Sequence, residues 1–150
     1  MEWDSPLVGM GFGLRGFATR TGSSKTFYTV QGLDDSARLL EGGIPFPNGP
    51  TKSFLGEGLY SFGSKSDAFK YKAMLEGFGA TDLKVMTFEV SNYSKLKTFD
   101  MRGLTDDAAN IWLEGNSFPK TSNFQHVIRP AGNFDEYYFS SSIFKNVKFK

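Results

Sequence analysis

The feature of this sequence that most constrains its fold is the order of its short apolar segments. Segments rich in β-branched and aromatic residues, which are typical of strands, occur at residues 25–31, 58–62, 83–90, 125–129, 137–139 and 143–149. They outnumber the segments with helical periodicity and do not alternate regularly with them. The sequence therefore predicts an α+β domain rather than a doubly wound α/β domain.

Side chains that can cap a helix N-terminus precede the predicted helices. They are Asp34, Asp35 and Ser36 before a short helix that Gly42 and Gly43 end, Ser64 and Asp67 at a helix over residues 65–76, and Thr105, Asp106 and Asp107 before a helix that ends at Gly115. In the strand at residues 83–90 the apolar positions change phase once, which we attribute to a bulge.

The composition indicates one folded domain. A chain of 150 residues with 39% hydrophobic residues can bury a substantial core. Glycines without helical or strand periodicity mark residues 1–24 as a Gly-rich leader or linker, so we assign the domain to residues 25–150. No run of about eighteen apolar residues is present, so we expect a soluble domain without a membrane span.

Charge and residue content exclude several kinds of site. The chain has no cysteine, so it has neither disulfides nor a thiolate metal site. Its single histidine, His126, lies in an apolar strand, which favours a structural role, and we expect no metal. A net charge of +1 gives no large basic face for nucleic acid, although RNA as a substrate stays open.

Two motifs carry candidate chemistry. In the first, residues 56–62 place two glycines before an aromatic strand, and residues 64–71 continue into a helix with further aromatic rings. Glycine lets a flat ring approach the backbone closely, and aromatic side chains can stack on that ring. In the second, residues 133–139, the carboxylate of Glu136 stands at the head of an aromatic strand.

These motifs, in this order, resemble the ADP-ribosyltransferase fold and more closely its diphtheria-toxin and poly-ADP-ribose polymerase branch. Residues 56–60 and 64–68 match the Gly-x-Gly strand and the Ser-Lys-Ser-Ala helix of that branch, and residues 135–137 match its Asn-Glu-Tyr strand. At the branch's first motif, the alignment places Thr29 where the family has a histidine or an arginine. The resemblance covers residues 25–75 and 133–139.

The resemblance implies two packed, mainly antiparallel sheets with short flanking helices around an NAD cleft. It also implies a mono-ADP-ribosyltransferase that uses NAD as a co-substrate and breaks its nicotinamide–ribose bond. Glu136 would bond the ribose hydroxyl and stabilise the developing cation as nicotinamide leaves. Tyr60 would pack on the nicotinamide, and either Tyr71 or Phe69 would close its other face.

The remaining NAD contacts come from the first strand and the glycine motif. The backbone of Val30 would hold the carboxamide, with Tyr28 and Gly58 beside it. Thr29 would replace the family's histidine as a hydroxyl donor to the adenosine ribose, and Gln31 is a second candidate for that contact.

The acceptor of ADP-ribose is expected to be a macromolecule, protein or RNA. Arginine-modifying transferases carry a second glutamate two residues before the catalytic one, and here that position is Phe134. We therefore expect an acceptor other than arginine, with Phe134 offering a surface on which a base or ring can stack.

The small size and the Gly-rich leader also resemble toxin domains at the C-termini of bacterial Rhs-type and other polymorphic effectors. That resemblance implies delivery by a larger secreted parent protein, action in the target-cell cytoplasm and a cognate immunity protein. Two alternatives stay open: an NAD glycohydrolase or RNA 2′-phosphotransferase on the same fold, and a non-catalytic binding module.

Overall fold

The structure is a computed structural model, and it describes residues 23–45, 58–105, 107–108, 111 and 124–150. Most of the predicted leader and most of the helix expected after Thr105 therefore lie outside the described residues. The start of that helix is described. There the backbone N–H of Ala108 donates to Thr105 Oγ1 at 3.0 Å, as expected of an N-cap.

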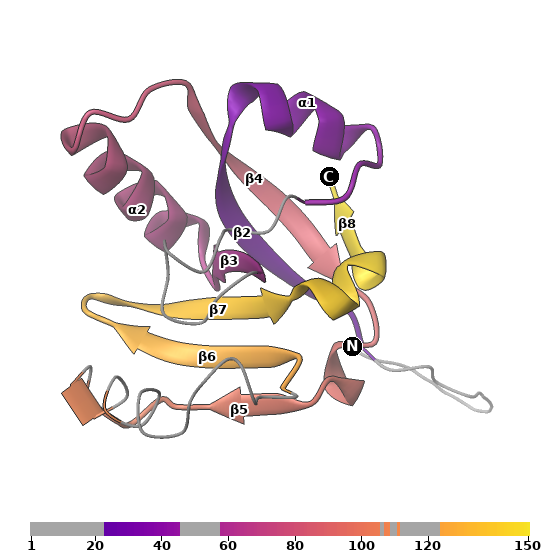
Figure 1. Ribbon diagram of the computed structural model, residues 1–150, viewed down its shortest axis with the longest axis vertical. Coiled ribbons are helices and arrows are strands. Elements are labelled where there is room, and N and C mark those ends of the chain that lie inside the picture. The colour runs from indigo at the N-terminus through magenta and orange to yellow at the C-terminus, as the bar shows by residue number, and fades with distance from the viewer. Residues whose placement is uncertain (1–22, 46–57, 106, 109–110, 112–123) are drawn as a thin grey trace.

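The described strands form one mixed sheet with the order β5-β6-β7-β3-β2-β4-β8 (Figure 1). Their bounds are β2 (Lys25–Gly32), β3 (Gly58–Phe62), β4 (Leu83–Val90), β5 (Thr98–Asp100), β6 (His126–Ala131), β7 (Phe134–Ser140) and β8 (Val147–Phe149). Neighbouring strands are antiparallel except β5 and β6, which are parallel. The α+β class expected from the sequence is confirmed.

Besides the start of the helix after Thr105, the described residues form two α-helices and two short 3-10 helices: α1 (Leu33–Leu40), α2 (Lys65–Gly77), η2 (Tyr93–Lys95) and η3 (Ser141–Asn146). The predicted cap of α2 is confirmed, since Ser64 Oγ accepts from the Asp67 N–H at 3.1 Å. The cap predicted for α1 is wrong. Gly32 is its N-cap, and Asp34 and Asp35 lie in its first turn, where negative charge favours the helix dipole.

In the part of the chain that the structure describes, a single register pair joins the two halves of the sheet. β2 pairs with β4 along its whole length, but with β3 only where Tyr28 lies opposite Phe62. In Figure 1, β2 and β4 run diagonally, whereas β5, β6 and β7 lie across the lower half. We expected two packed sheets. The described strands instead form one sheet, because this junction connects the two groups of strands.

Buried hydroxyl groups support the backbone around the junction. Thr29 Oγ1 donates to the backbone oxygen of Tyr60 at 2.8 Å, and Ser61 Oγ donates to that of Tyr137 at 2.7 Å. The side chains of Thr29 and Ser61 are almost completely buried. Because a buried carbonyl oxygen without a donor is destabilising, the Thr29 hydroxyl helps β2 to separate from β3 just beyond Tyr28, and the Ser61 hydroxyl strengthens the contact of β3 with β7.

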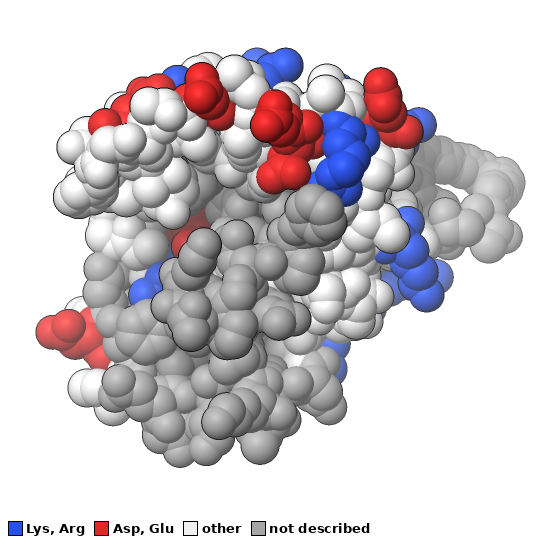
Figure 2. Space-filling view, turned by 45° about the horizontal axis from the view of Figure 1, so that its top comes forward, with Lys and Arg blue, Asp and Glu red and all other residues white. Residues whose placement is uncertain are grey.

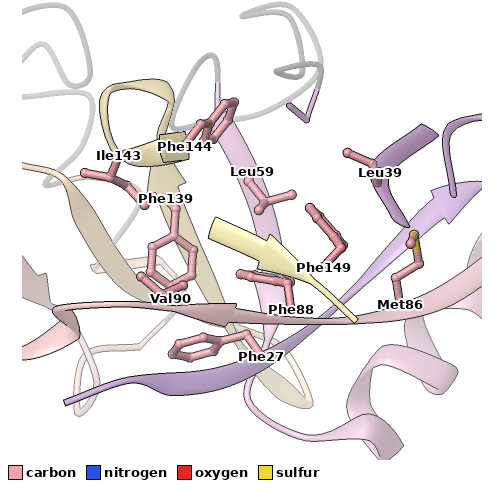
Figure 3. Close-up of a cluster of buried hydrophobic side chains, with 10 residues drawn as sticks. All are labelled: Phe27, Leu39, Leu59, Met86, Phe88, Val90, Phe139, Ile143, Phe144 and Phe149. Carbon is pink, nitrogen blue, oxygen red and sulfur yellow. The ribbon is translucent and has the colours of Figure 1, made fainter. Parts of the chain in front are cut away.

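Both faces of the sheet bury apolar side chains. The larger cluster, drawn in Figure 3, packs against α1 and contains Phe27, Leu39, Leu59, Met86, Phe88, Val90, Phe139, Ile143, Phe144 and Phe149. The opposite face carries a smaller cluster of Met101, Val127 and Tyr138. Burial of each large apolar side chain contributes ~1.5–3 kcal/mol, so these clusters supply most of the stability.

The bulge predicted in β4 is absent. Each of its residues has a register partner on β2, without an insertion. Met86 and Phe88 are buried in the larger cluster, whereas Leu83 and Val85 alternate onto the other face, where α2 packs. The change of phase in the sequence therefore reflects a strand that is covered on both faces.

The strand predicted over residues 143–149 is divided into η3 and β8. Ile143 and Phe144 are sequence neighbours and are both buried in the larger cluster. A strand would point them to opposite faces, so the chain turns as a 3-10 helix instead. Ser140 Oγ accepts from the Ser142 N–H at 3.2 Å and caps this turn.

His126 is a buried structural residue. Its Nδ1 lies 2.9 Å from the carbonyl oxygen of Tyr138, which can only accept, so Nδ1 carries the proton and Nε2 accepts from the Tyr93 hydroxyl at 2.7 Å. The imidazole stacks on Phe139 with ring centroids 4.3 Å apart. Burial lowers the pKa of His126 to about 4, so the ring is neutral at pH 7.

This burial predicts a specific loss of stability in acid. As the pH falls from 6.5 toward 4, the unfolded chain protonates this histidine and the folded protein does not, so the free energy of unfolding decreases. The histidine should account for a loss of about 3 kcal/mol across this window. Urea unfolding of wild type and His126→Gln at neutral and acidic pH measures this loss, and the variant should lose less stability by about that amount.

Glu136 also changes the free energy of unfolding with pH, in the opposite sense, because its pKa is raised. Its contribution is present in both proteins and does not affect their difference. Equal acid sensitivity in the two proteins would contradict the assignment.

Candidate functional site

Alternate residues of β7 bring a carboxylate and aromatic rings to one face of the sheet. Glu136 lies opposite Phe62 of β3 and opposite Arg129 of β6. Paired residues of antiparallel strands point to the same face, so these side chains gather on the face where α2 packs. Phe134, two residues before Glu136, shares this face. We call Glu136, Arg129, Phe62, Phe134 and Tyr71 of α2 the Glu136 cluster.

Glu136 is a largely buried carboxylate with one oxygen engaged. Its side chain is 18% exposed, and Nη1 of Arg129 donates to Oε1 at 3.2 Å. Among the described residues, none hydrogen-bonds the second oxygen, Oε2. Burial raises the pKa of Glu136, and the charge and hydrogen bond of Arg129 oppose that rise. Arg129 thus engages one oxygen of Glu136, and no described residue donates a hydrogen bond to the other.

Three rings of the cluster form a wall beside the carboxylate. The rings of Tyr71 and Phe62 have centroids 5.0 Å apart, and Phe134 meets both edge-on, at 5.0 Å from Phe62 and 6.2 Å from Tyr71. Burial raises the pKa of Tyr71 and the nearby charge of Glu136 raises it further, so its phenol is neutral at pH 7 and can donate a hydrogen bond.

Tyr60 lies two residues before Phe62 of the Glu136 cluster, at the next position on the same face of β3. It lies opposite Tyr138, with ring centroids 5.2 Å apart, and its side chain is half-buried against the smaller apolar cluster. Tyr60 and Glu136 are therefore diagonal neighbours on one face of two paired strands. The structure brings together the two residues that the sequence placed at the centre of the site.

Thr29 and Gln31 are on the other face of the sheet. Tyr28 shares the face of Phe62, so its neighbour Thr29 and the next alternate residue, Gln31, point away from it. The buried Thr29 hydroxyl donates to the backbone of Tyr60 and accepts from Gln31 Nε2 at 3.1 Å. The structure thus does not bring either candidate for the family's histidine position to the carboxylate.

Tyr28 and Val30 are the residues of β2 that face the site. Tyr28 lies opposite Phe62 at the junction, and Val30 lies two residues beyond it, where β2 has no register partner on β3. Both side chains are half-buried. These two predicted contacts therefore border the place where the two halves of the sheet diverge.

Helix α2 directs Tyr71, and not Phe69, toward the cluster. Ala68 is fully buried against the sheet, and Tyr71 follows it by three residues on the same helix face. Phe69 is 52% exposed. Of the two rings expected to close a pocket, Tyr71 is the one beside Glu136.

Gly58 makes room for a ring of the protein itself. A Cβ at this position would overlap Cε1 of Tyr138 and would lie 2.6 Å from the backbone oxygen of Phe139. We expected the glycine to admit a flat ligand. In the structure, the ring that occupies this space is Tyr138.

The sequence predicts neither Phe62 nor Arg129 as a site residue. The signal for Phe62 was present, because it follows Tyr60 by two residues on a predicted strand. The signal for Arg129 lies in the hairpin between β6 and β7, where Ala131 pairs with Phe134 across a two-residue turn. That register alone places Arg129 opposite Glu136.

The face of the molecule drawn in Figure 2 shows little segregation of charge among the described residues. In Figure 2 acidic and basic side chains are interspersed, and neither sign forms one broad patch on that face. Within the residues that the structure covers, no group of three or more His, Asp and Glu side chains is placed to hold a metal ion. No helix among them is both long and apolar enough to cross a membrane.

Fold and site together define an α+β domain with an ion-paired carboxylate on an aromatic sheet face. Comparisons with known proteins add no relative to this description. No protein-family model matches the chain, no curated protein matches it, and no solved structure matches it.

The packing at Gly58 predicts a large difference between two glycine substitutions. Gly58→Ala should lower the free energy of unfolding by about 2 kcal/mol or more, because the added methyl group overlaps Tyr138. Gly77→Ala is the matched control, since a Cβ there meets nothing within 4 Å and the residue is helical. It should be neutral or stabilise by up to ~1 kcal/mol. Urea unfolding measures both, and equal effects would show that the Tyr138 ring does not fill the space at Gly58.

Proposed function

We propose that this domain is a mono-ADP-ribosyltransferase that cleaves NAD between nicotinamide and ribose and transfers ADP-ribose to a macromolecular acceptor. The observation that carries the proposal is the position of Glu136, near Tyr71 and diagonal to Tyr60, with no described residue donating a hydrogen bond to its Oε2. The order of the motifs in the sequence supplies the assignment of NAD to this face.

The proposed reaction uses the carboxylate electrostatically. When the bond between ribose C1′ and the pyridinium nitrogen breaks, its electron pair stays with nicotinamide, which leaves as a neutral molecule. Positive charge is left on C1′ and the ribose ring oxygen. Glu136, accepting a ribose hydroxyl hydrogen through Oε2, stabilises that charge in a largely buried setting. The acceptor then donates an electron pair to C1′, and its proton passes to solvent.

The other residues on this face bind and shield the substrate in the proposal. Tyr60 and Tyr71 supply ring faces for nicotinamide, and the aromatic wall excludes water from the reacting bond. Val30 offers backbone groups beyond the junction, where β3 does not pair with them. Tyr28 borders the same position.

A biological setting follows from the sequence resemblance to effector toxin domains. In this setting a larger secreted parent protein delivers the domain to the cytoplasm of a target cell. A cognate immunity protein protects the producing cell by binding the domain.

The decisive test is Glu136→Gln, which keeps the shape of the side chain and removes its charge. We expect NAD binding to persist while nicotinamide release falls about a hundredfold or more. Nicotinamide release by the purified protein and NAD affinity by calorimetry measure the two effects. Near-normal turnover in this variant would remove Glu136 from the reaction.

Asp135→Asn is the matched control for that experiment. It makes the same chemical change one residue away, but Asp135 pairs with Pro130 and points to the other face of β7. Its turnover should stay near that of wild type. Free ADP-ribose as the sole product would indicate a glycohydrolase, and NAD binding without any turnover would indicate a binding module.

The site also predicts what the acceptor is not. A substrate guanidinium near Glu136 would meet a second cation, Arg129, and the ring of Phe134 instead of a second carboxylate. We expect free arginine and agmatine to be poor acceptors. Reaction with a bacterial lysate, with and without nuclease, followed by mass spectrometry identifies the modified atom. ADP-ribosylated arginine as the main product would overturn this prediction.

A further inference from the structure

Arg129 is fixed next to Glu136 by the backbone of a tight hairpin. The turn at Gly132 and Asn133 connects β6 to β7, and Gly132 adopts a φ of 71°, which glycine reaches without strain. The resulting register sets Arg129 directly across from Glu136, and both side chains are largely buried, at 14% and 18% exposure. The arginine is therefore held in place before any substrate arrives.

Building on the proposed function, we propose that Arg129 is a positioning residue, whose guanidinium holds Oε1 of Glu136 so that the carboxylate stays ionised and presents Oε2 to the ribose hydroxyl. The contact is a single hydrogen bond of 3.2 Å from Nη1 to Oε1. A contact through one oxygen orients the carboxylate and leaves the second oxygen without a hydrogen bond from Arg129. A bidentate contact would engage both oxygens, and neither would then be without a donor when the substrate binds.

The surroundings of Glu136 give this role to Arg129 among the described residues. From α2 the carboxylate faces the neutral phenol of Tyr71, and from β3 it faces the uncharged ring of Phe62. Burial raises the pKa of Glu136, and Arg129 is the neighbour whose charge lowers it. Without that charge the carboxyl would take up a proton at a higher pH and would lose the negative charge that the reaction requires.

The test compares wild type with Arg129→Gln and Arg129→Lys. The first reading is the titration of the Glu136 carboxyl carbon by NMR, assigned by its absence in Glu136→Gln. Arg129→Gln should raise the pKa of Glu136, and Arg129→Lys should restore most of the wild-type value because it keeps the charge. An unchanged Glu136 titration in folded Arg129→Gln would overturn the proposal, whether or not the protein cleaves NAD.

The second reading is the pH profile of nicotinamide release. In Arg129→Gln the acidic limb should move to higher pH by the same amount as the carboxyl titration, with release about tenfold lower for each unit of that shift below the new pKa. The KM for NAD should change little. If nicotinamide release falls equally at all pH values and the acidic limb of the profile does not move, that result would also count against a positioning role. If wild type releases no nicotinamide at any pH, the proposed function is wrong, but the positioning role of Arg129 is still decided by the carboxyl titration.

Arg102→Gln controls for loss of a positive charge elsewhere. Arg102 makes a bidentate ion pair with Asp100, with Nε donating to Oδ1 and Nη2 to Oδ2, and both side chains are substantially exposed. This variant should leave the Glu136 titration and the pH profile unchanged. If Arg129→Gln does not fold, Arg129→Lys still decides the matter. Its ammonium keeps the charge but is a point charge on a different stem, so a positioning role predicts a Glu136 pKa close to the wild-type value with a reduced kcat, whereas a wild-type kcat would overturn the role.

Discussion

The architecture depends on how little backbone pairing joins β2 to β3. Among the described residues, one register position, Tyr28 opposite Phe62, connects the strands on either side, and side-chain contacts add to it. Phe27 reaches across the junction to Phe139 and Tyr137, with ring centroids 5.0 Å and 5.3 Å away. The Thr29 hydroxyl occupies a backbone carbonyl that a longer ladder would have paired. The two groups of strands can therefore diverge without leaving these buried groups unsatisfied, and the residues that border the divergence face α2.

The same junction determines what kind of site this sheet can carry. Strand alternation sends Thr29 into the interior and Tyr28 to the opposite face, and it assigns Glu136 and Asp135 to different faces of β7. A carboxylate in a largely apolar setting is unfavourable unless it is paired, and the hairpin register meets that requirement with Arg129. Arg129 therefore compensates the burial of Glu136 through Oε1, while no described residue donates a hydrogen bond to Oε2. An ion pair of this kind occurs in purely structural settings as well, and the proposed function rests on the second oxygen of Glu136, to which no described residue donates a hydrogen bond.

Local signals in the sequence predicted much of the fold. The strands at β2, β3 and β4 and the Ser64 cap of α2 follow from residue type and alternation alone. β5 was missed because three residues carry too little periodicity, and its strand character comes from pairing with β6. η3 was mistaken for a strand because its apolar residues gave no sign that neighbours would be buried together. The site followed the same division. Motif order predicts Glu136 and Tyr60 as site residues. The position of Arg129 opposite Glu136 follows only from the strand register, and the position of Thr29 follows only from knowing which face of β2 points inward.

The outermost strands of the described sheet, β5 and β8, are only three residues long. An exposed sheet edge is a template on which another chain can add a strand, and the strength of such an addition grows with the number of backbone groups left open. Each of these two edges offers few open backbone groups. β8 also carries Lys148, and Lys150 follows its last residue, so an added strand would have to accommodate two positive charges. The sheet thus keeps its longest and most aromatic strands in its interior, and these short margins disfavour fibre-like association between copies of the protein.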